Sequence, residues 1–123
     1  MEYSDEVLRQ AAQVAHEANR AYCKNIGDNS QPPFGEAPYW QVISAINGIR
    51  HHWNNPELTP EASHQNWVYE KELTGWKWGP VKDEVKREHP CMVPFSHLPR
   101  EQQVKDYLFS AIARVLRPCD DGT

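Results

Sequence analysis

The sequence predicts a small, mainly α-helical single domain of about four helices, with a short extended or β segment near Trp76 and Trp78. Apolar residues recur at the spacing of one helix face in four separate stretches. Capping residues or prolines bound these stretches. Between the third and fourth stretches, the segment from Gly75 to Pro80 interrupts the helical period. The length of 123 residues suits one compact domain with a modest core.

The first helix is expected from about Asp5 to Lys24. Ser4 is a favourable N-cap, and the acidic residues after it complement the positive end of the helix dipole. Gly27 marks the end of the helix. The proline- and glycine-rich stretch 25–38 is typical of a loop, in which we expect Phe34 to contact the core.

The second helix is expected from about Tyr39 to Trp53, because Pro38 suits a first helical turn and apolar residues follow at helical spacing. The sequence 54–56, which contains a proline, ends it. Gly48 in its interior costs about 1 kcal/mol relative to alanine. A close crossing of two helices would explain this glycine.

The third helix is expected from a cap at Thr59 to about Leu73, with an end at Gly75. Four of its residues fall on one face at spacings of three and four: His64, Trp67, Val68 and Lys71. A last helix is expected from about Arg100 to Leu116, and residues 119–123 are expected to form a frayed tail.

Two tryptophans lie one residue apart in the segment between the third and fourth helices. If this segment is extended, Trp76 and Trp78 share one face. Lys82, Lys86 and Arg87 follow closely, so aromatic faces with nearby cations suit a planar anionic ligand. The alternative is that these large side chains belong to the core, because aromatic residues dominate core packing as readily as binding sites.

The second half of the chain resembles the RyR domain, a repeat first named in the cytoplasmic shell of ryanodine receptors and also found in small stand-alone bacterial and phage proteins. The resemblance is carried by four stretches in order: His64-Gln65-Asn66-Trp67, Gly75-Trp76-Lys77-Trp78-Gly79-Pro80-Val81-Lys82-Asp83, Lys86-Arg87-Glu88-His89-Pro90-Cys91-Met92-Val93-Pro94-Phe95 and Leu98-Pro99. Gln65 stands where the family pattern has glutamate, and Trp78 where it has tyrosine.

The resemblance implies an RyR-like repeat at residues 59–117, with an N-terminal helical part at 4–56 packed on it. It also implies a non-catalytic module that binds a nucleotide or a nucleotide-derived signal. The ligand-binding residues would be His64, Trp67, Trp76, Trp78, Lys82, Asp83, Lys86 and Arg87. Among them, Trp76 would stack on the base, the three cations would meet phosphates, and Asp83 would accept from a ribose or an exocyclic amine.

Two alternatives follow from the same resemblance. The domain could act as an interaction or scaffold module without a small ligand, because exposed aromatic residues often anchor protein partners. In the receptors these repeats come in tandem pairs, so either a homodimer or the N-terminal helices would supply the second half here. The sequence leaves both choices open.

Composition and motifs exclude several other classes. The formal net charge of −4 argues against a sequence-independent hold on a nucleic acid polymer. The acidic N-terminus and the lack of a long apolar run predict neither a signal peptide nor a membrane span, and three irregularly spaced cysteines suit reduced thiols in the cytoplasm. No recognisable catalytic or metal-binding motif is present, so no cofactor and no enzymatic activity are expected.

A faint internal echo links the two halves of the sequence. His64, Gly75 and Pro80 follow His16, Gly27 and Pro32 by one constant interval. A degenerate half-repeat would explain this spacing, but coincidence between two histidine-bearing helices is the favoured interpretation, because short matches often arise by chance.

Overall fold

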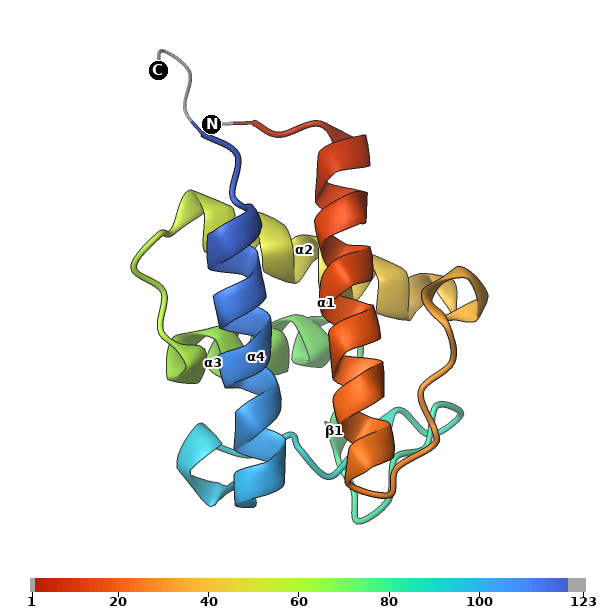
Figure 1. Ribbon diagram of the computed structural model, residues 1–123. Helices are drawn as coiled ribbons and strands as arrows, with labels where there is room; N and C mark the ends of the chain where they lie inside the picture. Colours follow the sequence, from red (N-terminus) through yellow and green to blue (C-terminus); the bar gives the residue numbers. More distant parts are fainter. Residues whose placement is uncertain (1, 120–123) are drawn as a thin grey trace.

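The computed structural model describes residues 2–119 and contains four α-helices. They are α1 (Asp5–Asn25), α2 (Tyr39–Asn54), α3 (Pro60–Leu73) and α4 (Arg100–Leu116). In Figure 1, α1 and α4 run side by side in front of α2 and α3, which cross behind them. The prediction of a mainly helical domain is confirmed. Residues 120–123, most of the expected tail, lie outside the described part of the chain.

The helix starts follow the local sequence. The Ser4 hydroxyl accepts a hydrogen bond from the Val7 amide at 3.2 Å, and the Thr59 hydroxyl accepts one from the Ala62 amide at 3.1 Å. Each satisfies one of the amide groups that the first turn of a helix leaves without a partner. Pro60 needs no such partner, because it has no amide hydrogen.

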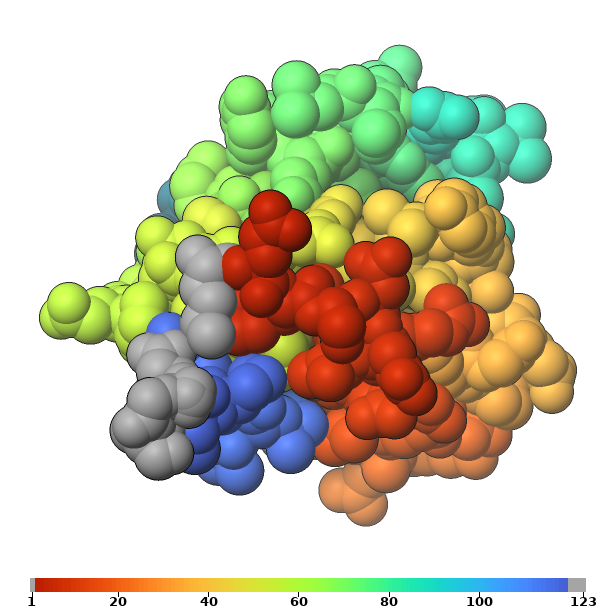
Figure 2. Space-filling view, turned by 90° about the horizontal axis from the view of Figure 1, so that it is seen from above, coloured from red at the N-terminus to blue at the C-terminus, as the bar shows by residue number. Residues whose placement is uncertain are grey.

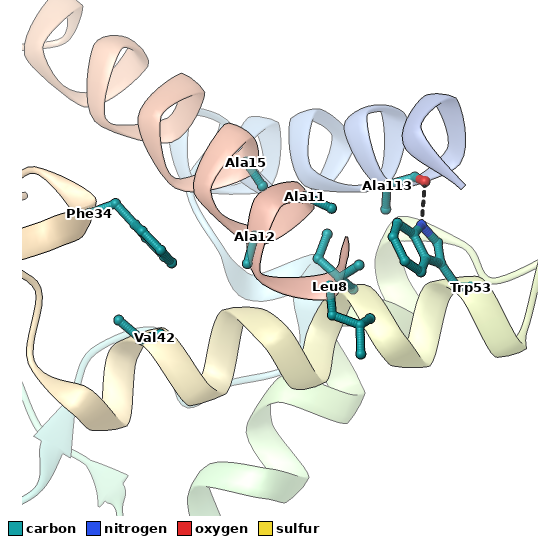
Figure 3. Packing of buried hydrophobic residues seen from close by; sticks show 9 residues of the cluster. Leu8, Ala11, Ala12, Ala15, Phe34, Val42, Trp53 and Ala113 are labelled. Atoms are coloured by element: carbon teal, nitrogen blue, oxygen red, sulfur yellow. Dashed lines mark hydrogen bonds between the residues drawn. The ribbon is translucent and has the colours of Figure 1, made fainter. Parts of the chain in front are cut away.

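The hydrophobic core lies between α1, α2 and α4 (Figure 3). Its buried members are Leu8, Ala11, Ala12, Ala15, Phe34, Val42, Ile49, Trp53 and Ala113. The Trp53 indole nitrogen donates a hydrogen bond to the Ala113 carbonyl at 2.8 Å, so this tryptophan joins α2 to α4 through a polar contact as well as by packing. The expected contact of Phe34 with the core is confirmed.

A glycine in α2 lets α2 and α4 approach each other closely. A Cβ atom added at Gly48 would lie 2.9 Å from Cζ of Phe109. Glycine therefore lets α2 approach α4 at this point, which is the close crossing that the sequence suggested for Gly48.

A residue before α1 and a residue after α4 both bind the end of α2. The Trp53 carbonyl accepts hydrogen bonds from the Tyr3 hydroxyl at 3.3 Å and from Nε of Arg117 at 2.9 Å. In the view from above, α3 and the segment after it form one edge of the molecule, α1 and α4 lie at the opposite edge, and α2 runs between them (Figure 2). Of the helices in residues 2–119, none combines the length and the apolar character needed to cross a membrane.

The segment between α3 and α4 contains two short parallel strands, β1 (Lys77–Trp78) and β2 (Glu88–His89). The Lys77 amide donates to the Arg87 carbonyl at 2.9 Å, and the Gly79 amide donates to the His89 carbonyl at 3.3 Å. This confirms the short β segment predicted near the two tryptophans. The pairing holds His89 beside the stretch that follows α3.

The two halves of the chain share one geometry. In each half, a helix ends at a glycine with positive φ, a short 3₁₀ helix follows, and a second helix begins after a proline. The glycines are Gly27 (φ +89°) and Gly75 (φ +87°), and the 3₁₀ helices are Phe34–Glu36 and Phe95–His97. Both glycines form the same helix-terminating motif, in which the next residue's amide reaches back five residues.

A buried histidine repeats in the same place. Nε2 of His16 donates to the Pro32 carbonyl at 2.7 Å, and Nε2 of His64 donates to the Val93 carbonyl at 2.8 Å. Each carbonyl lies two residues before the phenylalanine of the following 3₁₀ helix. The structure thus pairs the histidines and glycines as the sequence echo does, but Pro32 corresponds to Val93 and not to Pro80. The second half differs by the inserted segment that carries β1 and β2.

Candidate functional site

The end of α3 places Lys71 and Trp76 beside each other. The Trp76 amide donates to the Lys71 carbonyl at 3.0 Å, and the Gly75 amide donates to the Glu72 carbonyl at 3.1 Å. This pair of hydrogen bonds is a Schellman motif, which requires the left-handed conformation that Gly75 adopts. The motif brings together the side chains at its two ends, and Nζ of Lys71 lies 5.3 Å from the centre of the Trp76 ring.

This geometry corrects one expectation. Trp76 and Trp78 do not share a face, because Trp76 is 7% exposed and Trp78 is 55% exposed. The strand contains only Lys77–Trp78, and the backbone of Trp76 belongs to the helix-terminating motif. The alternating directions of an extended chain therefore do not apply to this pair. Trp76 points inward and Trp78 points outward.

A cavity of about 270 Å³ lies between the two halves of the domain. Side chains from all four helices and from the segment after α3 line it. Those that the following paragraphs use are Trp40, His64, Trp67, Lys71, Trp76 and His89. The cavity thus combines aromatic surface with a few polar groups, which is the usual composition of small-molecule sites.

The aromatic wall is a chain of ring contacts. The centres of Trp40 and Trp76 are 5.4 Å apart at an interplanar angle of 49°. His89 lies 6.4 Å from Trp76 and 5.1 Å from Trp67, and Trp67 stacks on His64 at 5.6 Å. Burial lowers the pKa of His89 to about 4, so this ring is neutral at pH 7 and adds no charge to the wall.

Two lysines lie at one end of this wall. Nζ of Lys71 is 4.4 Å from the centre of the Trp40 ring, and Nζ of Lys82 is 5.5 Å from the same centre. Lys71 is only 7% exposed. Burial, and then repulsion from Lys82, lowers the pKa of Lys71 to about 8, against a smaller opposing effect of Glu70. The Lys71 ammonium therefore keeps its charge at pH 7 in a desolvated place.

An acid and a histidine face each other elsewhere in the cavity wall. Nδ1 of His64 lies 3.6 Å from Oδ2 of Asp106. Burial raises the pKa of Asp106 to about 7 and lowers the pKa of His64. Since Nε2 of His64 carries a proton for the Val93 carbonyl, Nδ1 is an acceptor, and at 3.6 Å it makes no hydrogen bond to Asp106. Nδ1 of His64 and the Asp106 carboxyl are therefore the polar groups of this pair that a ligand in the cavity could meet.

The structure brings four of the eight predicted site residues into the cavity: His64, Trp67, Trp76 and Lys82. Of the four residues that the spacing places on one face of α3, three are buried in the structure: His64, Val68 and Lys71.

The other four predicted site residues lie outside the cavity: Trp78, Asp83, Lys86 and Arg87. The Asp83 carboxylate accepts from the amides of Val85 and Lys86, so it stabilises a turn. Arg87 has a positive φ of 55° and donates to the Thr74 carbonyl at the end of α3. These roles belong to the path of the chain between β1 and β2.

Four cavity residues that shape its aromatic wall and its charge were not among the predicted site residues: Trp40, Lys71, His89 and Asp106. Lys71 could have been found from the sequence, because its spacing from His64 places both residues on one face of α3. Trp40 had none, because it comes from α2, and only the fold brings it to Lys71.

Cys91 also lines the cavity, but its surroundings do not activate it. Burial raises the pKa of the Cys91 thiol, and a thiol is a weak nucleophile compared with a thiolate. Nδ1 of the nearby His89 accepts a hydrogen bond from the Cys91 amide at 3.0 Å. Within residues 2–119, no group of three or more histidine, cysteine or acidic side chains is placed to hold a metal ion.

The fold and the cavity define a small helical domain whose two similar halves enclose an aromatic site with a buried lysine at one end. The family model of the RyR domain matches residues 46–118 of this chain. The chain therefore belongs to the RyR domain family. The match begins within α2, earlier than the repeat boundary expected from the motifs.

Proposed function

We propose that this RyR domain is a non-catalytic module that binds a small nucleotide or nucleotide-derived ligand in the cavity between its halves. The aromatic wall of Trp40, Trp67 and Trp76 carries this proposal, because indole rings stack favourably on nucleobases at about 1–3 kcal/mol per base. The volume of about 270 Å³ is near the lower end of the usual range of roughly 300–1,000 Å³ for small-molecule sites. A ligand of mononucleotide size is favoured.

The cavity also supports one choice about assembly. Its walls come from both halves of a single chain, since α1 and α2 contribute side chains as well as α3 and α4. We infer that the N-terminal helices, residues 4–56, take the place of the second repeat of a tandem pair, so that the site needs no homodimer.

Calorimetry with a panel of mono-, di- and cyclic nucleotides tests the ligand proposal. Trp40→Leu should weaken nucleotide binding at least tenfold, because it removes one stacking surface from the cavity. Trp78→Leu is the matched control, since Trp78 is 55% exposed and lies outside the cavity. No heat with any nucleotide, or an equal loss in both variants, would contradict the proposal.

A second candidate function rests on the exposed apolar side chains after α3. Trp78, Val81 and Val85 are 55%, 70% and 95% exposed, and exposed aromatic residues often anchor protein partners. In this alternative the domain is an interaction or scaffold module without a small ligand. Inertness to the nucleotide panel, with a protein partner that Trp78→Ser releases and Trp40→Leu retains, would favour it.

A further inference from the structure

Lys71 is a buried cation without a counter-charge. The residue is only 7% exposed, and within the described residues its Nζ makes no hydrogen bond and no ion pair; Nζ lies over the faces of Trp40 and Trp76, and Lys71 lines the cavity. Taking a charge out of water is costly unless an opposite charge or hydrogen-bond acceptors compensate. Cation–π contacts compensate only in part. The ammonium therefore has hydrogen-bonding capacity left for an anion in the cavity.

A second cation increases this imbalance. Lys82 reaches the same Trp40 ring from the segment after β1, and its repulsion contributes to the lowered pKa of Lys71. Glu70 also lines the cavity and attracts Lys71, but it lies outside the distance of an ion pair. Two ammonium groups, the buried Lys71 and the exposed Lys82, thus lie near one indole, and within the described residues neither is ion-paired at this end of the cavity.

The backbone holds Lys71 in this place. The Schellman motif fixes the Lys71 carbonyl to the Trp76 amide at 3.0 Å, and the same motif sets Trp76 against the lysine side chain. An ammonium that the fold positions before the ligand arrives loses little conformational entropy on binding, and such preorganisation favours affinity.

We propose that the Lys71–Lys82 end of the cavity is an anion subsite that holds a phosphate group of the ligand. This inference rests on the proposed nucleotide-binding function and locates the charged part of that ligand. A phosphate monoester carries about 1.5 to 2 negative charges at pH 7, which matches two ammonium groups better than a single carboxylate does. Lys86 and Arg87, the phosphate partners expected from the sequence, have no part in this subsite.

The subsite also gives the ligand a direction in the cavity. Lys71 is near the end of α3, and His64 is two turns earlier on the same helix, about 10 Å away along its axis. The phosphate then lies at the Lys71 end, and the uncharged part of the ligand extends along the wall of Trp40, Trp76 and Trp67 toward the His64–Asp106 pair.

Lys71→Met tests the subsite, with AMP, adenosine and pyrophosphate as probes in calorimetry. Methionine keeps an unbranched apolar stem against the indoles and removes the charge. We expect AMP and pyrophosphate to bind the variant about 10- to 100-fold more weakly, from the loss of charge-assisted hydrogen bonds. Adenosine should bind wild type and variant equally. Lys86→Met removes the same charge outside the cavity and should leave all three affinities unchanged.

The outcomes separate this inference from the function on which it rests. Wild-type binding of AMP that Lys71→Met leaves intact would overturn the subsite and keep the nucleotide proposal. Pyrophosphate binding that needs Lys71, in a protein that takes no nucleotide, would overturn the nucleotide proposal and keep the anion subsite. A wild-type protein that binds neither nucleotides nor pyrophosphate would overturn both.

Proton uptake by the wild-type protein gives a second measurement that needs no variant. A phosphate beside Lys71 stabilises the ammonium and raises its pKa, so AMP binding near pH 8 should take up part of a proton. Calorimetry in two buffers of different ionisation enthalpy measures this uptake. Uptake with AMP but not with adenosine supports the subsite. Equal proton exchange for both probes contradicts it.

Discussion

Gly79, the residue after β1, lies so close to Glu88 of β2 that a Cβ atom added at Gly79 would lie 2.5 Å from the Cβ of Glu88. Real Cβ atoms essentially never approach another atom this closely. The Cβ of Glu88 is attached to the backbone, so it cannot move aside as the end of a flexible side chain could. The glycine therefore lets β1 and β2 pair, and the pairing holds His89 against Trp76 and Trp67 in the cavity wall.

Gly79→Ala should force β1 and β2 apart. We expect a loss of about 1–3 kcal/mol in the free energy of unfolding, the usual cost of an inserted methyl group that cannot be accommodated. Gly35→Ala is the control, since a Cβ there has no neighbour within 4 Å, and it should change stability by no more than about 0.5 kcal/mol. Urea denaturation measures both. Equal stability of the two variants would show that the strands adjust to the methyl group.

Leu98 is a second stability determinant, at the end of the 3₁₀ helix before α4. It is 6% exposed, so Leu98→Ala should cost about 2–5 kcal/mol of unfolding free energy by leaving a cavity. Leu73→Ala is the matched control, because Leu73 is 68% exposed. If the melting temperature of the Leu98 variant equals that of wild type, Leu98 is not a core anchor.

The three cysteines should react at different rates with a thiol reagent. Cys119 is exposed, Cys23 is fully buried, and Cys91 is partly buried. Burial raises the pKa of both Cys23 and Cys91, which lowers their thiolate fraction. We expect one fast thiol in the native protein, three in denaturant, and none fast in Cys119→Ser. A native Cys91 that reacts as fast as Cys119 would contradict this order.

The helices could be predicted from the sequence because their signals are local. Ser4 and Thr59 cap the helices that they precede, and apolar residues at helical spacing mark the buried faces. The same spacing placed His64, Val68 and Lys71 on one face of α3, which the structure buries. These properties depend on neighbours within a few residues, so the fold class and the ends of the helices needed no tertiary information.

The candidate site could be predicted only in part, because it depends on contacts between distant segments. The burial of Lys71 arises from Trp40 of α2 and Trp76 of the following segment. Arg87 and Lys86 are close to Trp78 in sequence, but the turn stabilised by Asp83 directs them away from the cavity. Sequence distance to a tryptophan was therefore a poor guide to which cations share its pocket.

Two histidines with lowered pKa values should make the protein sensitive to acid. Burial lowers the pKa of His52 and of His89 to about 4, whereas a histidine in the unfolded chain has a pKa of about 6.5. Between pH 6.5 and 4 the unfolded chain binds protons that the folded protein does not. Stability should therefore fall as the pH falls through this window, by on the order of 2–3 kcal/mol for each histidine.

Asp106 opposes this trend. Burial raises its pKa from 3.8 to about 7, so its contribution to stability is full below about pH 4 and is lost as the pH rises to about 7. Between pH 6.5 and 4, the stability gained from Asp106 offsets roughly the stability lost from one of the two histidines. Asp106→Asn should therefore make the protein more sensitive to acid and more stable than wild type at pH 8.

Urea denaturation at pH 6.5 and pH 4.5 measures these contributions. His52→Gln should reduce the difference in unfolding free energy between the two pH values, because the amide keeps a partner for the Ser63 and Ser110 hydroxyls and does not titrate. His97→Gln, at an exposed position, is the matched control and should keep the wild-type difference. A pH difference that is the same in wild type and in His52→Gln would show that the His52 ring does not resist protonation in the folded protein.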